Sequence, residues 1–243
     1  MPVPLPTETA AEGKAPLCLV IAAHPDDIES WAAGAVAVLV RQGWRAVYVL
    51  CTSGDKGTSD LHETPARVAA RREAEQRAAA HIVGADEPMF LRMPDGELED
   101  NRLLLGLLVR ELRRWRPHLL ITHDPVTPWP PYTTHRDHRI AGRVALDAAY
   151  PYARDPLHFP EQLRDEALQP HVTPEAWLFS SSAPNHYLDI SATLDAKIAA
   201  RLAHMSQTDD PIALDAGWRD RATEIGAPAG VPYAEAFKRL LLG

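Results

Sequence analysis

A histidine and two adjacent aspartates follow the first long apolar run of the chain. The apolar residues 17–23 predict a buried strand, and His24-Pro25-Asp26-Asp27 begins where that strand should end. Open α/β sheets bind their ligands at the carboxyl ends of strands. Taken alone, the tetrapeptide is also compatible with a simple turn, because proline and aspartate are frequent turn residues.

A second cluster of the same residue types lies far downstream. His135-Arg136-Asp137-His138 supplies two imidazoles and a carboxylate directly before an amphipathic stretch. Catalytic zinc sites commonly take three protein ligands from histidine and carboxylate side chains and leave a fourth position to water. The two clusters together predict one metal site, and its expected ligands are His24, Asp27 and His138.

Asp26 is the carboxylate that this ligand set leaves unused. Because Asp26 and Asp27 are adjacent, their side chains should diverge at a strand-to-helix turn, so that one binds the metal while the other stays free. A metal lowers the pKa of bound water to roughly 7, and a nearby carboxylate can accept the proton as the water attacks a carbonyl. The sequence predicts Asp26 as the general base of an amide hydrolase.

His135 and Asp137 are expected beside the metal rather than on it. His135 lies three residues before His138, which places both on one face of a helix that begins there. A protonated His135 could stabilise the oxyanion and donate a proton to the leaving amine. Asp137 could hold a ring nitrogen of a neighbouring histidine or could cap the helix, and the spacing does not decide between these roles.

Strand-like and helix-like segments alternate up to residue 150. The apolar patterns predict strands at residues 17–23, 45–52, 89–93 and 118–122, alternating with helices at residues 29–42, 65–82, 101–115 and 137–150. This order implies a parallel sheet. A proline-punctuated stretch then precedes strands at residues 176–179 and 186–190 and helices at residues 192–204 and 233–242. We expect a single-domain, Rossmann-like α/β fold with a mainly parallel sheet flanked by helices and with C-terminal additions.

The composition of the chain argues against nucleic acids and membranes as partners. The 243 residues carry a formal net charge of -8 and no basic run, which argues against nucleic acid and against an anionic membrane surface. The most apolar window, residues 31–40, is far shorter than the roughly 20 residues of a membrane span. Residues 1–15 lack the features of a secretory signal and predict a disordered tail before one domain at residues 16–243. Cys18 and Cys51 fall in predicted strands as buried thiols, which fits a cytoplasmic location.

The two clusters closely resemble the signature of the PIG-L (LmbE-like) deacetylase family. The resemblance rests on Ala-His-Pro-Asp-Asp-Ile-Glu at residues 23–29 and on His-Arg-Asp-His-Arg at residues 135–139. Further similar motifs are Thr52-Ser53-Gly54-Asp55-Lys56-Gly57, Arg72-x-x-Glu75 with Gly84, Pro94-Asp95-Gly96 and His204-x-Ser206-Gln207. The resemblance spans about residues 17–207.

The resemblance implies removal of an acyl group, usually acetyl, from the 2-amino nitrogen of a glucosamine unit in a small-molecule conjugate. It implies zinc on the two histidines and the aspartate named above, Asp26 as base and His135 as the oxyanion-stabilising acid. It also implies substrate contacts from Arg72 and Asp95. From the residues alone, Arg72 could equally belong to a solvated arginine stripe, and Asp95 could be a plain turn residue.

Two other functions stay open at this point. One is an amidase that acts on a thiol-sugar conjugate, and the other is a metal-binding or sugar-binding module without turnover. Ferrous iron suits two histidines and one aspartate as well as zinc does. The sequence also leaves open the sugar, the acyl chain, a homo-oligomeric state, and the roles of Tyr132, His123 and His204.

Overall fold

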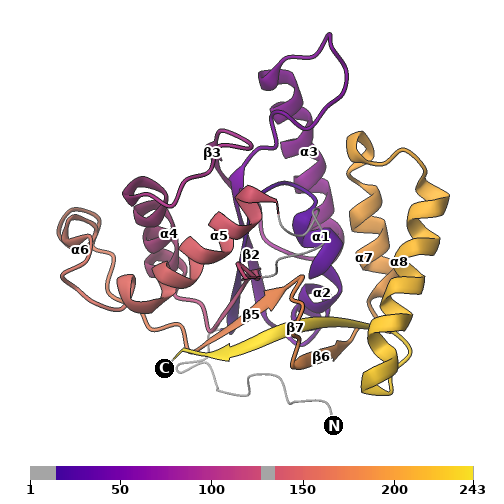
Figure 1. Cartoon of the computed structure of the whole chain (residues 1–243). Coiled ribbons are helices and arrows are strands. Elements are labelled where there is room, and N and C mark those ends of the chain that lie inside the picture. Colours follow the sequence, from indigo (N-terminus) through magenta and orange to yellow (C-terminus); the bar gives the residue numbers. More distant parts are fainter. Residues whose placement is uncertain (1–14, 127–134, 243) are drawn as a thin grey trace.

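The computed structural model describes residues 15–126 and 135–242, and within these residues seven strands form one sheet (Figure 1). The strand order is β3-β2-β1-β4-β5-β7-β6. The strands are β1 (Leu17–Ala22), β2 (Arg45–Thr52), β3 (Met89–Met93), β4 (Leu119–His123), β5 (Glu175–Phe179), β6 (His186–Asp189) and β7 (Ala234–Leu241). Strands β1 to β5 pair in parallel, and β7 runs antiparallel to β5 and β6. The expected mainly parallel α/β fold is confirmed.

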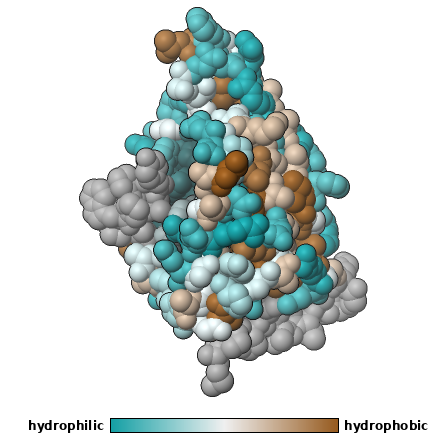
Figure 2. Space-filling view, turned by 90° about the vertical axis from the view of Figure 1, so that its right-hand side faces the viewer, coloured by the Kyte–Doolittle hydropathy of each residue, from teal (hydrophilic) through white to brown (hydrophobic). Residues whose placement is uncertain are grey.

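Helices cover both faces of the sheet (Figure 1). One side carries α1 (Asp27–Trp31), α2 (Ala33–Arg41), α3 (Pro65–Val83), α7 (Leu194–Leu202) and α8 (Pro211–Gly226). The other carries α4 (Arg102–Trp115), α5 (Arg136–Asp147) and α6 (Pro160–Glu166). The described residues also form three short helices: η2 (Ala148–Tyr152), η3 (Met205–Gln207) and η4 (Ala227–Ala229). Hydrophilic and hydrophobic residues are intermixed on the face that α8 presents (Figure 2).

The central strand β1 is buried on both faces, which explains its unbroken apolar sequence. Cys18 and Val20 pack into the core beneath α2, whereas Leu19 and Ile21 pack into the core beneath α4 and α5. Both cysteines are buried and unbonded, as expected. No helix of the described residues is long and apolar enough to cross a membrane.

The direction in which the chain adds strands to the sheet reverses between β1 and β4. From β1 the chain moves outward to β2 and β3, then returns to place β4 on the other side of β1. Such a switch point opens a crevice at the carboxyl ends of the two strands. Helix α5 approaches the end of β4 closely at Gly142, where an added Cβ would lie 2.3 Å from the backbone oxygen of His123. Glycine at this position lets α5 bring its first turn to the crevice.

The prediction of a helix at residues 233–242 is wrong, because this segment forms strand β7 between β5 and β6. Its alanine, glutamate, lysine and leucine residues favour a helix locally. Pairing along both edges, together with complete burial of Phe237, overrides that preference. The C-terminal additions therefore extend the sheet as well as adding helices beside it.

Other differences concern helix boundaries. The expected helix at residues 29–42 is divided into α1 and α2 at Ala32. Helices α6 and α8 were not expected, although Asp210 caps α8 and Pro211 occupies its first turn, a recognisable start signal. Asn101 caps α4, and Thr64 caps α3 with Pro65 in the first turn of that helix. The expected tail lies almost entirely in residues 1–14, outside the described residues, as does Tyr132.

Candidate metal centre and active site

The structure brings the three predicted metal ligands into mutual contact at the switch point. His24 follows β1, Asp27 begins α1, and His138 lies in the first turn of α5. His138 Nε2 lies 3.3 Å from His24 Nδ1 and 3.0 Å from Asp27 Oδ1, and His24 Nδ1 lies 3.5 Å from Asp27 Oδ2. Tetrahedral zinc with bonds of about 2.0–2.2 Å holds its ligand atoms roughly 3.3 Å apart. The spacing and donor types therefore fit a zinc ion.

Other side chains surround these three. Potential ligand atoms lie within 4.8 Å of one another in three overlapping groups: His24 with His135 and His138, Asp27 with His123 and His138, and His24 with Asp95 and Asp137. The first two groups meet at His138, and the predicted ligand set lies there. The third group lies on the opposite edge of the His24 ring.

That opposite edge explains which nitrogen of His24 is free for a metal. His24 Nε2 lies 3.0 Å from Asp95 Oδ1 and 3.3 Å from Asp137 Oδ2, so this nitrogen carries the hydrogen. Asp137 is fully buried and also accepts hydrogen bonds from the backbone amides of Gly96 and Leu98. The α5 cap is instead His135, whose Nδ1 accepts the Asp137 amide at 3.2 Å. Asp137 thus orients His24, whose Nδ1 faces His138 and Asp27.

Asp26 is held in a backbone conformation that non-glycine residues seldom adopt, with φ of 88°. The backbone amide of Asp26 donates to Gln76 Oε1 at 3.2 Å, and Gln76 in turn donates to the buried Glu29. Arg72 Nη2 lies 3.3 Å from Asp26 Oδ1, and Arg201 Nη2 lies 3.6 Å from Asp26 Oδ2. These contacts fix the Asp26 carboxylate, whose side chain is 21% exposed.

The adjacent aspartates have opposite proton affinities. Burial raises the pKa of Asp26, and the positive charge of Arg72 opposes this only in part. Burial also favours the neutral form of Asp27, but electrostatic interactions and hydrogen bonds with His138 and His123 outweigh it and hold its pKa well below the usual range. One carboxylate is therefore suited to bind a cation and the other to accept a proton.

Arg72 is buried, so the solvated-stripe interpretation does not describe it. Its guanidinium donates to the backbone oxygens of Pro25 and Gly54, at 2.6 and 3.1 Å. Gly54 has φ of +61°, and an added Cβ there would lie 2.1 Å from Arg72 Nη1, so this turn requires glycine. Asp95 is also buried and contacts His24. Both residues therefore lie in the site, where they contact the residues around Asp26 and His24.

His135 is exposed and borders the predicted ligands, with its ring centroid 4.9 Å from that of His24. Partial burial of its ring lowers its pKa, and electrostatic repulsion by His24 and His138 adds to this effect. The neutral ring is thus favoured over the protonated one that we expected from the sequence. Because Nδ1 accepts the Asp137 amide, the ring hydrogen resides on Nε2, which remains available as a donor.

Sequence reasoning assigned no role to three residues of the site. His123, at the end of β4, stacks on His138 with ring centroids 4.3 Å apart, and burial lowers its pKa to about 4. Gln76 and Arg201 position Asp26 from α3 and α7. Gln76 follows Glu75 of the Arg-x-x-Glu motif, and Arg201 lies shortly before His204. Only the packing of α3 and α7 brings these two residues to Asp26.

The Arg-x-x-Glu motif on α3 and the His-x-Ser-Gln motif at η3 contact one another. Glu75 accepts hydrogen bonds from the Ser206 amide and hydroxyl, at 2.8 and 2.7 Å. His204 is fully buried and its Nε2 lies 3.1 Å from Glu29 Oε2. The Arg-x-x-Glu and His-x-Ser-Gln motifs thus tie α3 to η3 next to the network that holds Asp26.

Two histidines and one aspartate thus converge at the switch point of a mainly parallel α/β sheet, in an arrangement that could hold a metal ion. The family model PIG-L, described as GlcNAc-PI de-N-acetylase, matches residues 19–149. The chain is 31% identical over 222 residues to the diacetylchitobiose deacetylase of Thermococcus kodakarensis, covering 90% of this chain and 81% of that protein. The chain belongs to the PIG-L family.

Two further comparisons bear on the fold and the reaction. The structure of N,N'-diacetylchitobiose deacetylase from Pyrococcus horikoshii superposes with a TM-score of 0.87 at 29% identity, covering 93% of this chain and 84% of that one. The 4-oxalmesaconate hydratase of Pseudomonas putida is 27% identical over 237 residues, covering 90% of this chain and 87% of that protein. The family scaffold is therefore shared by proteins named for different reactions.

Acidification is expected to release the metal. Burial alone would disfavour a charged His24 ring, but hydrogen bonds to Asp137, Asp27 and Asp95 outweigh it and raise its pKa well above the usual range. A proton on His24 Nδ1 competes directly with a metal. Metal affinity should therefore rise with pH and should begin to fall, on acidification, above the usual histidine pKa of about 6.5. Equilibrium dialysis against zinc at a series of pH values measures this, and pH-independent binding would contradict it.

Proposed function

We propose that this protein is a zinc-dependent N-deacetylase that removes an acyl group, most simply acetyl, from the amino group of a GlcNAc-like sugar conjugate. The observation that carries the proposal is the convergence of His24 Nδ1, His138 Nε2 and the Asp27 carboxylate beside a separate carboxylate, Asp26. Membership of the PIG-L family and the deacetylase names of its relatives support the substrate class.

His24, Asp27 and His138 would hold the metal. A zinc ion bound there would lower the pKa of a water molecule and polarise the amide carbonyl of the substrate. Asp26 would accept a proton from the attacking water, since its partly buried carboxyl has a raised pKa and is fixed by Arg72 and Arg201. The proton would then pass to the departing amine nitrogen as the C–N bond breaks. Water thus supplies the hydroxyl of the released acid and the hydrogen of the free amine.

His135 would donate its Nε2 hydrogen to the carbonyl oxygen as negative charge develops there. This role follows from its exposed position next to His24 and from the occupied state of its other nitrogen. Arg72 and Asp95 border the site from α3 and from the turn before α4, and we assign them to the recognition of sugar hydroxyls. Their existing contacts with Asp26 and His24 would couple substrate binding to the position of the base.

Replacing His135 with alanine should lower kcat by about 10²–10³-fold while zinc content stays near that of the wild type, because an oxyanion donor is lost and no ligand is removed. Steady-state kinetics together with elemental analysis of the purified variant measure both quantities. A proportional loss of zinc would instead assign His135 to the metal, in the group it forms with His24 and His138.

The test of the function is release of free amine from a panel of N-acetylglucosamine derivatives by zinc-loaded protein. Release from acetylated sugars supports the proposal. Release only from a thiol-sugar amide identifies an amidase, and zinc binding without release from any compound identifies a non-catalytic module. Because one relative is named as a hydratase, the panel includes 4-oxalmesaconate, and hydration without amide cleavage would overturn the proposal.

A further inference from the structure

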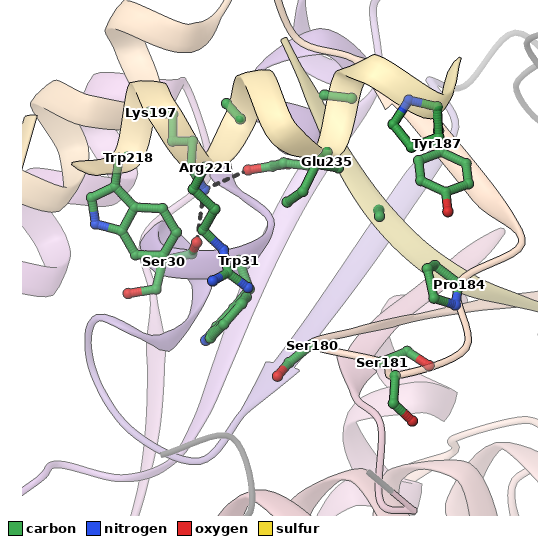
Figure 3. A pocket seen from close by; sticks show the side chains of 16 residues that line it. Ser30, Trp31, Ser180, Ser181, Pro184, Tyr187, Lys197, Trp218, Arg221 and Glu235 are labelled. Atoms are coloured by element: carbon green, nitrogen blue, oxygen red, sulfur yellow. Dashed lines mark hydrogen bonds and ion pairs between the residues drawn. The ribbon is translucent and has the colours of Figure 1, made fainter. Parts of the chain in front are cut away.

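A cavity of about 330 Å³ lies between the end of β5 and helices α1, α7 and α8 (Figure 3). Its volume is at the lower end of the roughly 300–1,000 Å³ usual for small-molecule sites. The side chains that give it its chemical character are Trp31, Ser180, Ser181, Tyr187, Trp218 and Arg221. None of the roles assigned to the metal centre uses this cavity.

Two elements connect the cavity to the metal centre. Trp31 ends α1, the helix that begins with the predicted ligand Asp27, so the two residues lie about one helical turn apart on the same face. Ser180 directly follows Phe179, whose ring centroid lies 4.5 Å from that of His123 in the site. The cavity therefore adjoins the metal centre along the carboxyl edge of the sheet.

Aromatic rings form two walls of the cavity. The ring centroids of Trp31 and Trp218 lie 5.9 Å apart, with ring planes at 89°. The Arg221 guanidinium lies 4.4 Å from the Trp31 ring centroid and 5.7 Å from that of Trp218. Within the described parts of the chain, no carboxylate forms an ion pair with Arg221, so its N–H groups are free to bind a ligand.

Polar groups line other parts of the cavity. The Ser180 hydroxyl is buried and has no hydrogen-bond partner among the described residues. Lys197 and Glu235 form a buried ion pair at 2.6 Å on one side of the cavity (Figure 3). Because a buried hydroxyl without a partner is costly, Ser180 is a ready hydrogen-bonding group for a molecule in the cavity.

We propose that this cavity is a second sugar subsite, which holds the pyranose ring attached to the reacting amino sugar. A pyranose presents apolar C–H faces, which pack on indole rings, and hydroxyl edges, which suit the Arg221 guanidinium and the Ser180 hydroxyl. A simple anion fits less well, because indole walls enclose the guanidinium and Glu235 contributes a carboxylate. The inference rests on the proposed deacetylase function and specifies its substrate as at least a disaccharide.

The experiment compares two substrates of the zinc-loaded protein, N-acetylglucosamine and the disaccharide N,N'-diacetylchitobiose. The readout is the ratio of their kcat/KM values for amine release. Trp218→Ala should lower the disaccharide-to-monosaccharide ratio about tenfold, because one aromatic wall is lost. Arg221→Gln should lower the same ratio in the same direction. Since Trp218 lies on α8, away from the metal ligands, its loss should leave the zinc content at the wild-type level.

Arg219→Gln is the matched control, because Arg219 lies on the same helix but pairs with Asp195 and Asp215 outside the cavity. It should leave the ratio unchanged. Circular dichroism checks the fold of each variant, and Arg221→Gln provides the test if Trp218→Ala does not fold. Release of amine from neither substrate by wild-type protein overturns the deacetylase function itself.

Amine release with a ratio that both cavity variants leave unchanged overturns the subsite alone. The subsite is also overturned if the two variants halve the molar mass measured by light scattering and lower both kcat/KM values equally. That result would assign the cavity to contact with a second copy of the chain.

Discussion

Asparagine at position 26 is expected to leave the metal bound and to reduce amide hydrolysis by about 10²–10⁴-fold, the usual contribution of a general base. The replacement preserves the shape of the side chain and its contacts with Arg72 and Arg201, but it removes the oxygen that accepts the proton. Zinc should remain bound because the predicted ligand is Asp27, not Asp26, and the Asp27 carboxylate contacts His138.

Elemental analysis and single-turnover kinetics on the same preparation test the Asp26→Asn prediction. A matched control is Asp86→Asn, because Asp86 pairs with Arg45 at the start of β2, the opposite edge of the sheet from the site. The control should match the wild type in both measurements. Loss of zinc from Asp26→Asn would make this residue a ligand, and an unchanged rate would leave the protein without the proposed base.

Alanine at position 138 should empty the metal site and abolish turnover. His138 contacts both other ligands, at 3.3 Å from His24 Nδ1 and 3.0 Å from Asp27 Oδ1, so its loss removes the residue that joins them. Loss of an orienting partner alone commonly costs about 10–100-fold in metal affinity, and loss of a ligand should cost more. Zinc affinity measured in competition with a chelator tests this.

The control for His138→Ala is His81→Ala, an exposed histidine in the last turn of α3, away from the site. Its zinc affinity should equal that of the wild type. Retention of full zinc affinity by His138→Ala would point to the set formed by His24, Asp95 and Asp137 as the ligands instead.

The chemistry of the site could be predicted from sequence because its residues are tied to local structure. His24, Asp26 and Asp27 occupy one strand-to-helix turn, whose place at the carboxyl edge follows from the strand before it. His138 joins them because β4 is the neighbour of β1, a frequent arrangement in this class of fold. Spacing within the two clusters therefore sufficed to select side chains that the fold brings together.

The supporting contacts could not be predicted in the same way. Gln76 and Arg201 reach Asp26 only because α3 and α7 pack side by side, and no local pattern encodes that packing. The partner of Asp137 depends on which edge of the His24 ring faces the start of α5, which spacing leaves open. The protonation of His135 depends on the charges around it, which are known only once the two clusters meet.

The fold shows the same division between local and distant information. The elements up to α5 follow apolar periodicity and caps, so their positions were predicted closely. Residues 233–242 have helix-forming composition, yet they form β7 because β5 and β6 offer unpaired edges on both sides. Segments whose conformation depends on partners distant in sequence are those where prediction from one sequence fails.

The central claim is that one cation is held jointly by His24, Asp27 and His138. Anomalous difference density, recorded above and below the zinc absorption edge on crystals of the zinc-loaded protein, tests this directly. We predict one strong peak about 2.0–2.2 Å from His24 Nδ1, His138 Nε2 and an Asp27 carboxylate oxygen. A peak on the Nε2 side of His24, against Asp95 and Asp137, or no peak among these residues, would contradict the account.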